Sequence, residues 1–372
     1  MRLQLANVFP ALLLVPVTVK AATYNVVKDY SGSTFFDAWD FYDHYDDKMN
    51  GDVNFVSQAA GLSDKLAYVD PNTSRAIIKV DNTTQVPYNE KRNSVRITSK
   101  DSYGIGSVWV ADMYHAPYGC SVWPAWWSYA GNATWPAGGE IDVFEGVNAM
   151  PSSQMGLHTT AGCKQTNPTQ LSTLVNTTDC AGDNNSGCML TNTNAASYGA
   201  KFADAQGGAF ITEFAESGIS IWFFPRSEIP KSVSASATSI DTSTLGTPMG
   251  NWPSSGCDIS KFFEPQNLVF TVTLCGDFAG PPNTFTQTCT GVCYTDYVIK
   301  DPSVYNNAYF DISYVKVFSS SAPASSGTTT SGGSASNTQS GQVKPTNGAG
   351  VLGASLLGLP LILCVIMALS AL

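Results

Sequence analysis

The sequence predicts an all-β fold, a sandwich of two antiparallel sheets. Between about residues 22 and 318 it shows many short runs of β-branched and aromatic residues, separated by Gly, Pro and Asn clusters, and almost no helical periodicity. Of the 372 residues, 43% are hydrophobic and 11% aromatic, which is enough for a large core. This composition excludes intrinsic disorder over most of the chain.

Four runs carry the strand prediction: residues 94–99, 218–224, 268–274 and 309–318. In the run 218–224, Ile219, Ile221 and Phe223 are expected on one face of the sheet and the intervening residues on the other. About 300 residues is large for one β domain, but disulfides and long loops accommodate that length. No internal repeat is evident, so we expect a single domain over residues 22–318.

The charge balance restricts the partners of the chain. It has 19 basic and 29 acidic residues, a net charge of -10, so it lacks the basic face that a nucleic-acid binder needs. Only 13% of its residues are charged, and Ser, Thr, Asn and Gly make up the difference, as in many secreted proteins.

The first 21 residues read as a secretory signal peptide. Arg2 gives a basic start, residues 12–19 are apolar, and Ala21 and Ala22 offer small side chains at the cleavage point. The alternative is an N-terminal membrane anchor, which the short apolar run with its nearby prolines disfavours.

The C-terminal end reads as a stalk followed by a lipid-attachment signal. Residues 319–347 are mostly Ser, Gly, Thr and Ala and predict a flexible, O-glycosylated stalk. Residues 348–372 end in an uncharged apolar segment, which is typical of a GPI-attachment propeptide, with Asn347 as the anchor and Ser340 and Asn337 as weaker candidates. The alternative is a true tail anchor, for which the segment is barely long enough. We therefore expect the membrane as a partner, through a GPI anchor on the outer face of the cell.

Eight of the nine cysteines lie in the predicted domain, and Cys364 lies in the propeptide. An even number in a secreted chain predicts up to four disulfides, whose pairing the sequence leaves open. A zinc site at Cys289 and Cys293 is the alternative, disfavoured by the oxidising compartment and by a total of three histidines. Five Asn-x-Ser/Thr sequons fit the secretory route. They lie at Asn72, Asn82, Asn132, Asn176 and Asn184.

The candidate catalytic residues are three acids, Glu140, Asp142 and Glu145, in an otherwise apolar strand. In a regular strand Glu140 and Asp142 share a face and Glu145 points the other way, among apolar side chains. Burying a carboxylate there is unfavourable. One β-bulge at Val143 and Phe144 returns Glu145 to the common face, and we predict that bulge.

The predicted bulge sets the distance between the outer acids. Glu140 and Glu145 are then about four strand rises apart, ~13 Å along the backbone, and two leaning side chains reduce the gap between carboxyls to ~5 Å. That spacing is typical of a retaining glycosidase, because an inverting enzyme needs ~6.5–9.5 Å. Asp142 between them would hydrogen-bond the nucleophile and help keep the acid protonated. The alternative is a solvated strand face.

Aromatic residues near the acids suggest a sugar cleft, since flat rings pack on pyranose faces. The candidate substrate contacts are Trp123, Trp127, Trp135 and His158. The alternative is core packing, which we expect for at least one of the neighbouring Trp126 and Trp127, and a structural role for His158. No Gly-x-Ser-x-Gly elbow supports serine-hydrolase chemistry.

The acidic motif Glu-x-Asp-x-x-Glu resembles the bulged signature of glycoside hydrolase family 16. Five further segments look like its fungal endo-β-1,3(4)-glucanase, or laminarinase, branch: residues 123–127, 135–139, 156–163, 222–226 and 275–280. The resemblance covers nearly all of residues 24–318 and implies a β-jelly-roll with a curved open cleft. One departure is Phe278, where the family pattern has Trp; it concerns one wall of that cleft.

The resemblance implies a role for each acid: Glu140 as nucleophile, Asp142 as its assistant and Glu145 as general acid/base. It implies a monomeric, cell-surface or cell-wall enzyme that hydrolyses β-1,3 or mixed-linkage glucans without metal or cofactor. The alternative is a cell-wall transglycosylase, although wall-crosslinking members favour the shorter Glu-x-Asp-x-Glu form. A third reading is a non-catalytic glucan-binding or structural wall protein.

Overall fold

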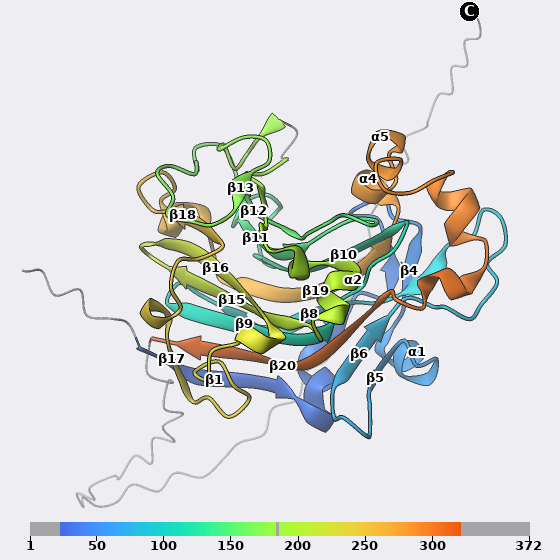
Figure 1. Cartoon of the computed structure of the whole chain (residues 1–372), viewed down its shortest axis with the longest axis horizontal. Helices are drawn as coiled ribbons and strands as arrows, with labels where there is room; N and C mark the ends of the chain where they lie inside the picture. Colours follow the sequence, from blue (N-terminus) through green and yellow to red (C-terminus); the bar gives the residue numbers. More distant parts are fainter. Residues whose placement is uncertain (1–22, 184–185, 321–372) are drawn as a thin grey trace, which may run out of the picture. The chain divides into compact units, whose positions relative to one another are not determined.

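The computed structural model describes residues 23–183 and 186–320 (Figure 1). The chain divides into two units, Met1–Ala324 and Ser325–Leu372, and all described residues belong to the first. The predicted signal peptide, the propeptide, Asn184, Asn347 and nearly all of the stalk lie outside the described residues. Among the described residues, no helix is both long enough and apolar enough to cross a membrane.

Two large sheets form the framework of the unit. The nine-stranded sheet has the order β17-β1-β20-β9-β15-β16-β18, with β6 on β20 and β5 on β6. Its strands are β1 (Thr23–Ser31), β5 (Ala67–Val69), β6 (Ala76–Lys79), β9 (Ser107–His115), β15 (Gly208–Ala215), β16 (Gly218–Pro225), β17 (Ser239–Asp241), β18 (Gly250–Pro253) and β20 (Tyr309–Ser319). Every pairing in it is antiparallel.

The eight-stranded sheet has the order β13-β14-β12-β11-β10-β19-β8-β2 and is also antiparallel throughout. Its strands are β2 (Trp39–Phe41), β8 (Arg96–Tyr103), β10 (Val122–Tyr129), β11 (Glu140–Glu145), β12 (Gln154–His158), β13 (Thr173–Leu174), β14 (Leu190–Thr191) and β19 (Gln266–Leu274). A small third sheet holds β3 (His44–Tyr45), β4 (Val53–Phe55) and β7 (Arg92–Ser94), and its β4–β7 pair is parallel.

The helices of the described residues are short and lie in the connections. The α-helices are α1 (Gln58–Ser63), α2 (Gly199–Asp204), α3 (Ile259–Phe262), α4 (Gly276–Ala279) and α5 (Pro282–Phe285). The 3-10 and π turns are η1 (Gly32–Ala38), η3 (Ala195–Ser197), η4 (Arg226–Glu228), η5 (Thr242–Thr244), η6 (Tyr294–Val298) and η7 (Pro302–Tyr305).

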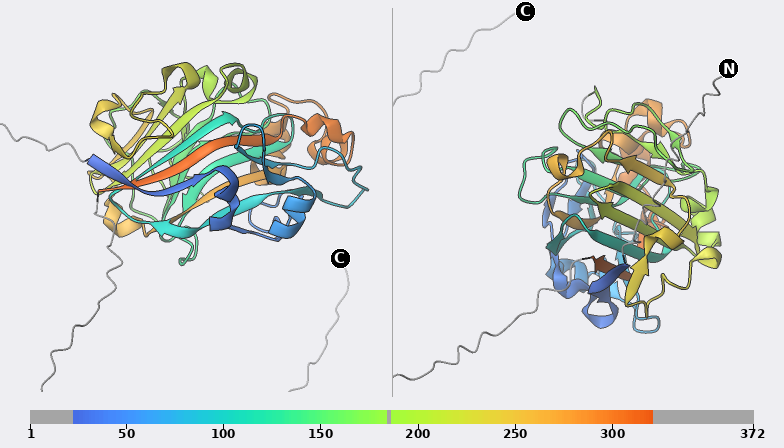
Figure 2. Two further views of the ribbon diagram at one scale, coloured as in Figure 1. Left: turned by 90° about the horizontal axis from the view of Figure 1, so that it is seen from below. Right: turned by 90° about the vertical axis from the view of Figure 1, so that its left-hand side faces the viewer.

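The main core lies between the two large sheets, which Figure 2 shows as stacked layers. Rings from both sheets meet there: Phe144 and Phe270 of one sheet each contact Phe310 of the other. On β16, Ile219, Ile221 and Phe223 face this core, as predicted. Their neighbour Trp222 belongs to a second apolar cluster on the outer face of the nine-stranded sheet. The predicted two-sheet antiparallel sandwich is therefore confirmed.

All eight cysteines of the domain are paired. The four disulfides are Cys120–Cys289, Cys163–Cys257, Cys180–Cys188 and Cys275–Cys293. Because Cys289 and Cys293 bond to different partners, the zinc alternative at these two residues is wrong. Two of the bridges tie the segment that carries α4, α5 and η6 to the ends of β10 and β19, beside the face that holds the acidic residues.

Candidate active site

The three acids lie on β11, which pairs with β10 on one side and β12 on the other. On β10, Trp127 pairs with Asp142 and the adjacent Trp126 pairs with Phe144, so Val143 is an extra residue. The register against β12 shifts in the same interval. The predicted β-bulge is thus present, and it places both Val143 and Phe144 in the core, fully buried.

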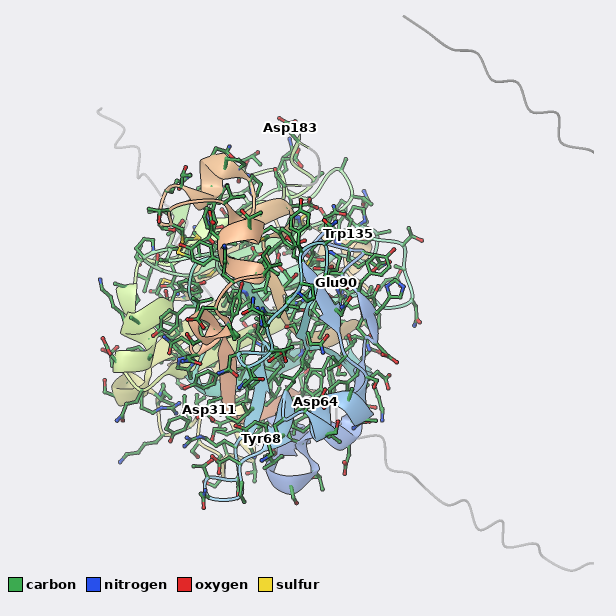
Figure 3. All side chains as sticks on the ribbon, turned by 90° about the vertical axis from the view of Figure 1, so that its right-hand side faces the viewer. Asp64, Tyr68, Glu90, Trp135, Asp183 and Asp311 are labelled. Atoms are coloured by element: carbon green, nitrogen blue, oxygen red, sulfur yellow. A yellow bond between two sulfur atoms is a disulfide. The ribbon has the colours of Figure 1, made fainter. Side chains whose placement is uncertain are left out.

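Two tryptophans each donate a hydrogen bond to one of the outer carboxylates. The indole N–H of Trp135 donates to Glu140 Oε2 at 2.8 Å, and that of Trp123 donates to Glu145 Oε1 at 2.8 Å. Trp135 is 47% exposed and lies among the peripheral side chains in Figure 3. These two predicted residues therefore meet the predicted acids directly, through polar edges that leave the Trp135 ring open to solvent.

Glycine fixes the entry of the chain into β11. Gly139 directly precedes Glu140 and has φ +73°, a region that favours glycine. A Cβ atom at this position would lie 2.3 Å from the ring of Phe263. The close approach of Gly139 to Phe263 therefore fixes the position at which β11 begins, with Glu140 as its first residue.

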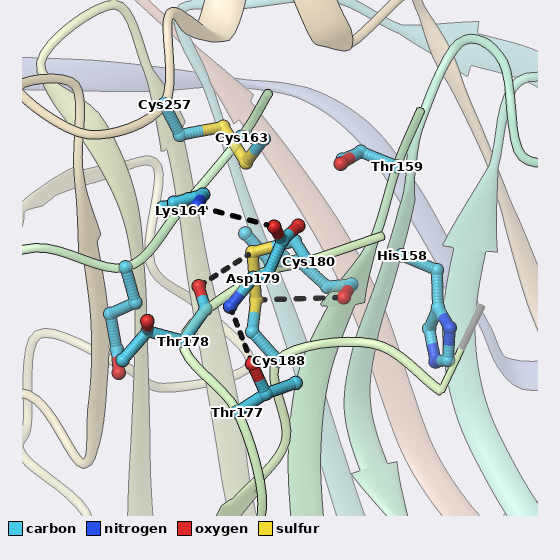
Figure 4. Close-up of a disulfide and its surroundings, with 12 residues drawn as sticks. His158, Thr159, Cys163, Lys164, Thr177, Thr178, Asp179, Cys180, Cys188 and Cys257 are labelled. Atoms are coloured by element: carbon cyan, nitrogen blue, oxygen red, sulfur yellow. Dashed lines mark hydrogen bonds and ion pairs between the residues drawn. A yellow bond between two sulfur atoms is a disulfide. The ribbon is translucent and has the colours of Figure 1, made fainter. Parts of the chain in front are cut away.

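His158 completes the group from the neighbouring strand. It pairs in register with Glu140, and its Nε2 lies 3.2 Å from Asp142 Oδ2 and 3.9 Å from Glu140 Oε1. Figure 4 shows its imidazole on β12, close to the Cys180–Cys188 bridge. Gly187 of that bridged loop packs against the ring, since a Cβ there would lie 2.8 Å from His158. Asp142, only 3% exposed, thus has an imidazole as its partner.

Burial and mutual repulsion hold protons on this site. Burial, together with the charge of Asp142, raises the pKa of Glu140 to about 8. The same two causes raise the pKa of Glu145 to about 7. The indole N–H groups of Trp135 and Trp123 oppose these rises, because a donor stabilises the charged carboxylate. The acidic group therefore retains a proton near neutral pH, which is what acid catalysis requires.

Part of this group also has a spacing that a metal ion can bridge. Glu140, Asp142 and His158 offer ligand atoms within 4.8 Å of one another. Trp135 already donates to Glu140, and His158 already faces Asp142. These contacts indicate that Glu140, Asp142 and His158 form a hydrogen-bonded acid cluster.

The neighbouring tryptophans of β10 have different surroundings. Trp126 is fully buried in the main core, as expected for one of the pair. Trp127 shares the face of Asp142 but is only 9% exposed; its N–H donates to Thr271 Oγ1 and its ring stacks on Tyr129. Trp127 thus forms part of the floor of the candidate active site. Contact between Trp127 and a substrate stays a prediction.

The sequence reasoning missed two residues next to the site. The buried Arg96 of β8 places its guanidinium 5.0 Å from the ring centre of Trp127 and 4.9 Å from that of Tyr42. Phe278, noted only as a departure, meets Trp123 edge-on at 5.6 Å. Nothing in the local sequence marks Arg96, because only the order of strands brings it beside Trp127.

Four of the five predicted glycosylation sites lie in the described residues. Asn72, Asn132 and Asn176 are exposed. Asn82 is half-buried, and its amide donates to Asn306 while its oxygen accepts from Lys79. A glycan at Asn82 would have to break those contacts, so the structure favours the other three.

An open strand face that presents paired carboxylates with raised pKa values, flanked by tryptophans, defines a glycoside hydrolase site. Comparison with known proteins agrees: the chain belongs to glycoside hydrolase family 16. A model described as an XgeA-like catalytic GH16 domain matches residues 39–318. The family indicated by the sequence motifs is therefore confirmed.

The relatives include fungal glucanases. A probable glycosidase of Schizosaccharomyces pombe is 36% identical over 80% of this chain and 70% of its own length. A probable endo-1,3(4)-β-glucanase of Aspergillus fumigatus is 32% identical over 87% of the chain. The chain spans only half the length of that second relative.

Two solved structures are similar over 80% of this chain and 100% of their own. One is Laminarinase 16A from Phanerochaete chrysosporium with β-glucans in its donor and acceptor sites, with 37% identity and a TM-score of 0.76. The other is an elongating family 16 β-1,3-glucosyltransferase, with 36% identity and a TM-score of 0.72. Both hydrolysing and transferring enzymes are thus among the proteins that this chain resembles.

Proposed function

We propose that the chain is a retaining endo-β-glucanase that hydrolyses β-1,3 or mixed-linkage β-1,3-1,4 glucans. The observation that carries the proposal is the bulge at Val143, which brings Glu140, Asp142 and Glu145 to one face with an indole N–H on each outer carboxylate. The named activities of the similar fungal proteins support the same substrate class.

In the first step, the Glu140 carboxylate attacks the anomeric carbon and forms a glycosyl ester. Glu145 gives its proton to the departing glycosidic oxygen as that bond breaks. In the second step, Glu145 removes a proton from water, the water oxygen attacks the anomeric carbon, and Glu140 leaves as a carboxylate. Asp142, which His158 contacts, raises the pKa of both glutamates by repulsion, so the pair retains a proton. The first step requires that proton on Glu145 and Glu140 as the carboxylate.

The experiment is hydrolysis of laminarin, lichenan and cellulose by the purified catalytic unit, with sizing of the products. We expect short oligosaccharides from laminarin or lichenan and none from cellulose. Proton NMR of the first product should show the β anomer; an initial α anomer would refute retention. Full activity of Glu140→Gln would refute the assignment of the nucleophile.

The second candidate is a cell-wall transglycosylase, favoured by the similarity to the elongating glucosyltransferase. It shares the first step, but a sugar hydroxyl instead of water attacks the glycosyl ester. Products longer than the donor oligosaccharide would identify transfer, whereas products that only shorten would identify hydrolysis. A protein that binds laminarin without any turnover would contradict both candidates.

We also propose that residues 1–21 direct secretion and that a GPI lipid at Asn347 holds the enzyme at the cell surface. The support is the sequence alone: a stalk over residues 319–347 and an apolar propeptide over residues 348–372. Phosphatidylinositol-specific phospholipase C should release activity from intact cells. Release that persists in Asn347→Gln but disappears in Ser340→Gln would move the anchor to Ser340.

A further inference from the structure

The outer face of the nine-stranded sheet carries a cavity of about 710 Å³. Its walls come from β1, β15, β16 and β18, which lie on the left side of Figure 1, and from the chain around η5. The acids of β11 belong to the other large sheet. The part of a ligand that occupies this cavity would therefore not contact Glu140.

The register of three strands creates the floor of the cavity. Glu213 of β15 pairs with Ser220 of β16, which pairs with Asn251 of β18, so three polar side chains form a row across the outer face. Further along β15, the outward-facing Ile211 and Ala209 are fully buried in the apolar cluster of that face. The outer face of β15 is therefore polar at Glu213, where it lines the cavity, and apolar at Ile211 and Ala209, where other parts of the chain cover it.

The hydrogen-bonding state of Glu213 suggests the kind of ligand. Its Oε1 accepts hydrogen bonds from the hydroxyls of Tyr24 and Thr242, at 2.9 and 2.6 Å. Among the described residues, no donor to its Oε2 is present, and Glu216 adds a second, exposed carboxylate at the rim. A carboxylate oxygen without a donor at a cavity wall is an acceptor for a ligand hydroxyl.

The side chains that line the cavity further restrict the class of ligand. The lining residues in the described part of the chain include two glutamates and no Lys, Arg or His, so an anionic ligand would be repelled. Trp222 and Tyr24 also line the cavity, but they are only 5% and 3% exposed and close its inner wall. The remaining lining offers carboxylates together with hydroxyl and amide groups, among them Ser220, Thr242 and Asn251, and this set of hydrogen-bonding groups suits an uncharged molecule rich in hydroxyls.

We propose that this cavity is a second saccharide-binding site, which takes an uncharged glucan chain outside the catalytic cleft. The choice of a β-glucan as its ligand rests on the proposed function, whereas the preference for a hydroxyl-rich neutral chain rests on the lining. A polymer bound at both places has a raised effective concentration at the cleft.

The test is native electrophoresis through gels that contain laminarin, with every protein in the Glu140→Gln background to prevent turnover. Adding Trp135→Ala weakens binding at the cleft, and the retardation that remains reports the cavity. Adding Ser217→Trp, at the exposed hairpin on the rim, should abolish the remaining retardation. Glu216→Gln should reduce it at least twofold in apparent affinity, and the exposed Glu228→Gln, outside the cavity, is the matched control.

Unchanged retardation in both Ser217→Trp and Glu216→Gln would overturn the proposal. Equal melting temperatures of the variants confirm that a loss of retardation is not a loss of fold, and Glu216→Gln decides the matter if Ser217→Trp does not fold. Failure of the wild-type chain to hydrolyse laminarin would overturn the proposed function instead, because retardation sensitive to Ser217→Trp needs no turnover.

Discussion

Replacing Glu145 with Gln should change how the stability of the domain depends on pH. Burial and the charge of Asp142 raise the pKa of Glu145 from 4.5 to about 7. Between these values the folded state keeps a proton that the unfolded chain has lost, so the free energy of unfolding falls as the pH rises. Gln cannot ionise, and its side-chain oxygen still accepts from the indole N–H of Trp123.

The size of the effect follows from the pKa. A rise from 4.5 to about 7, at 1.36 kcal/mol per pH unit, gives a ceiling of ~3 kcal/mol. The side chain is only partly shielded from water, so we expect Glu145→Gln to be ~1–3 kcal/mol more stable than wild type at pH 8. Well below pH 4.5, where both states hold the proton, the two proteins should differ little.

Urea unfolding followed by tryptophan fluorescence, from pH 4.5 to 8.5 at constant salt, measures this difference. The curve of wild type should descend across the window, and that of Glu145→Gln should descend less. The exposed Glu228→Gln serves as the control and should follow wild type. Parallel curves for wild type and Glu145→Gln, or a less stable variant at pH 8, would refute the reasoning.

Three further predictions address the same site. Trp123→Phe removes the N–H that lowers the pKa of Glu145, so the alkaline limb of the kcat/KM profile should move to higher pH; an unmoved limb would contradict this. Glu140→Gln should reduce kcat by ~10³-fold or more, measured on laminarin with its fold checked by melting temperature. Gly139→Ala should destabilise the domain by ~2–4 kcal/mol in urea, since its Cβ would meet Phe263 and its φ of +73° disfavours alanine; Gly104→Ala, where a Cβ meets open space, is the control.

The bulge could be predicted from the sequence because the cost of burying the Glu145 carboxylate in a regular strand depends only on neighbouring residues. A regular strand would bury Glu145, and only an extra residue between Asp142 and Glu145 prevents that. The register shows that residue as Val143. Alternation along β16 was predictable for the same reason, since each side chain's face depends only on its neighbours in the strand.

Features that depend on distant contacts were not predictable. The pairing of eight cysteines depends on which loops meet, and one bridge joins residues 169 positions apart. The run 94–99 is interrupted at Val95, where β7 leaves the small sheet and β8 joins the large one. The position of Arg96 beneath Trp127 follows from the order β10-β19-β8, which no local pattern encodes.

In the proposed mechanism, charge coupling within the trio accounts for Glu145 acting first as acid and then as base. The charge of Glu145 is among the causes that raise the pKa of Glu140, and Coulomb repulsion between two carboxylates is mutual. In that mechanism Glu140 reacts as a carboxylate and becomes a neutral glycosyl ester, so its repulsion of Glu145 disappears and the pKa of Glu145 falls. Glu145 has just given up its proton, and the lower pKa keeps it ionised until water arrives. Asp142 keeps its own repulsion throughout, which limits that fall and leaves Glu145 basic enough to take a proton from water.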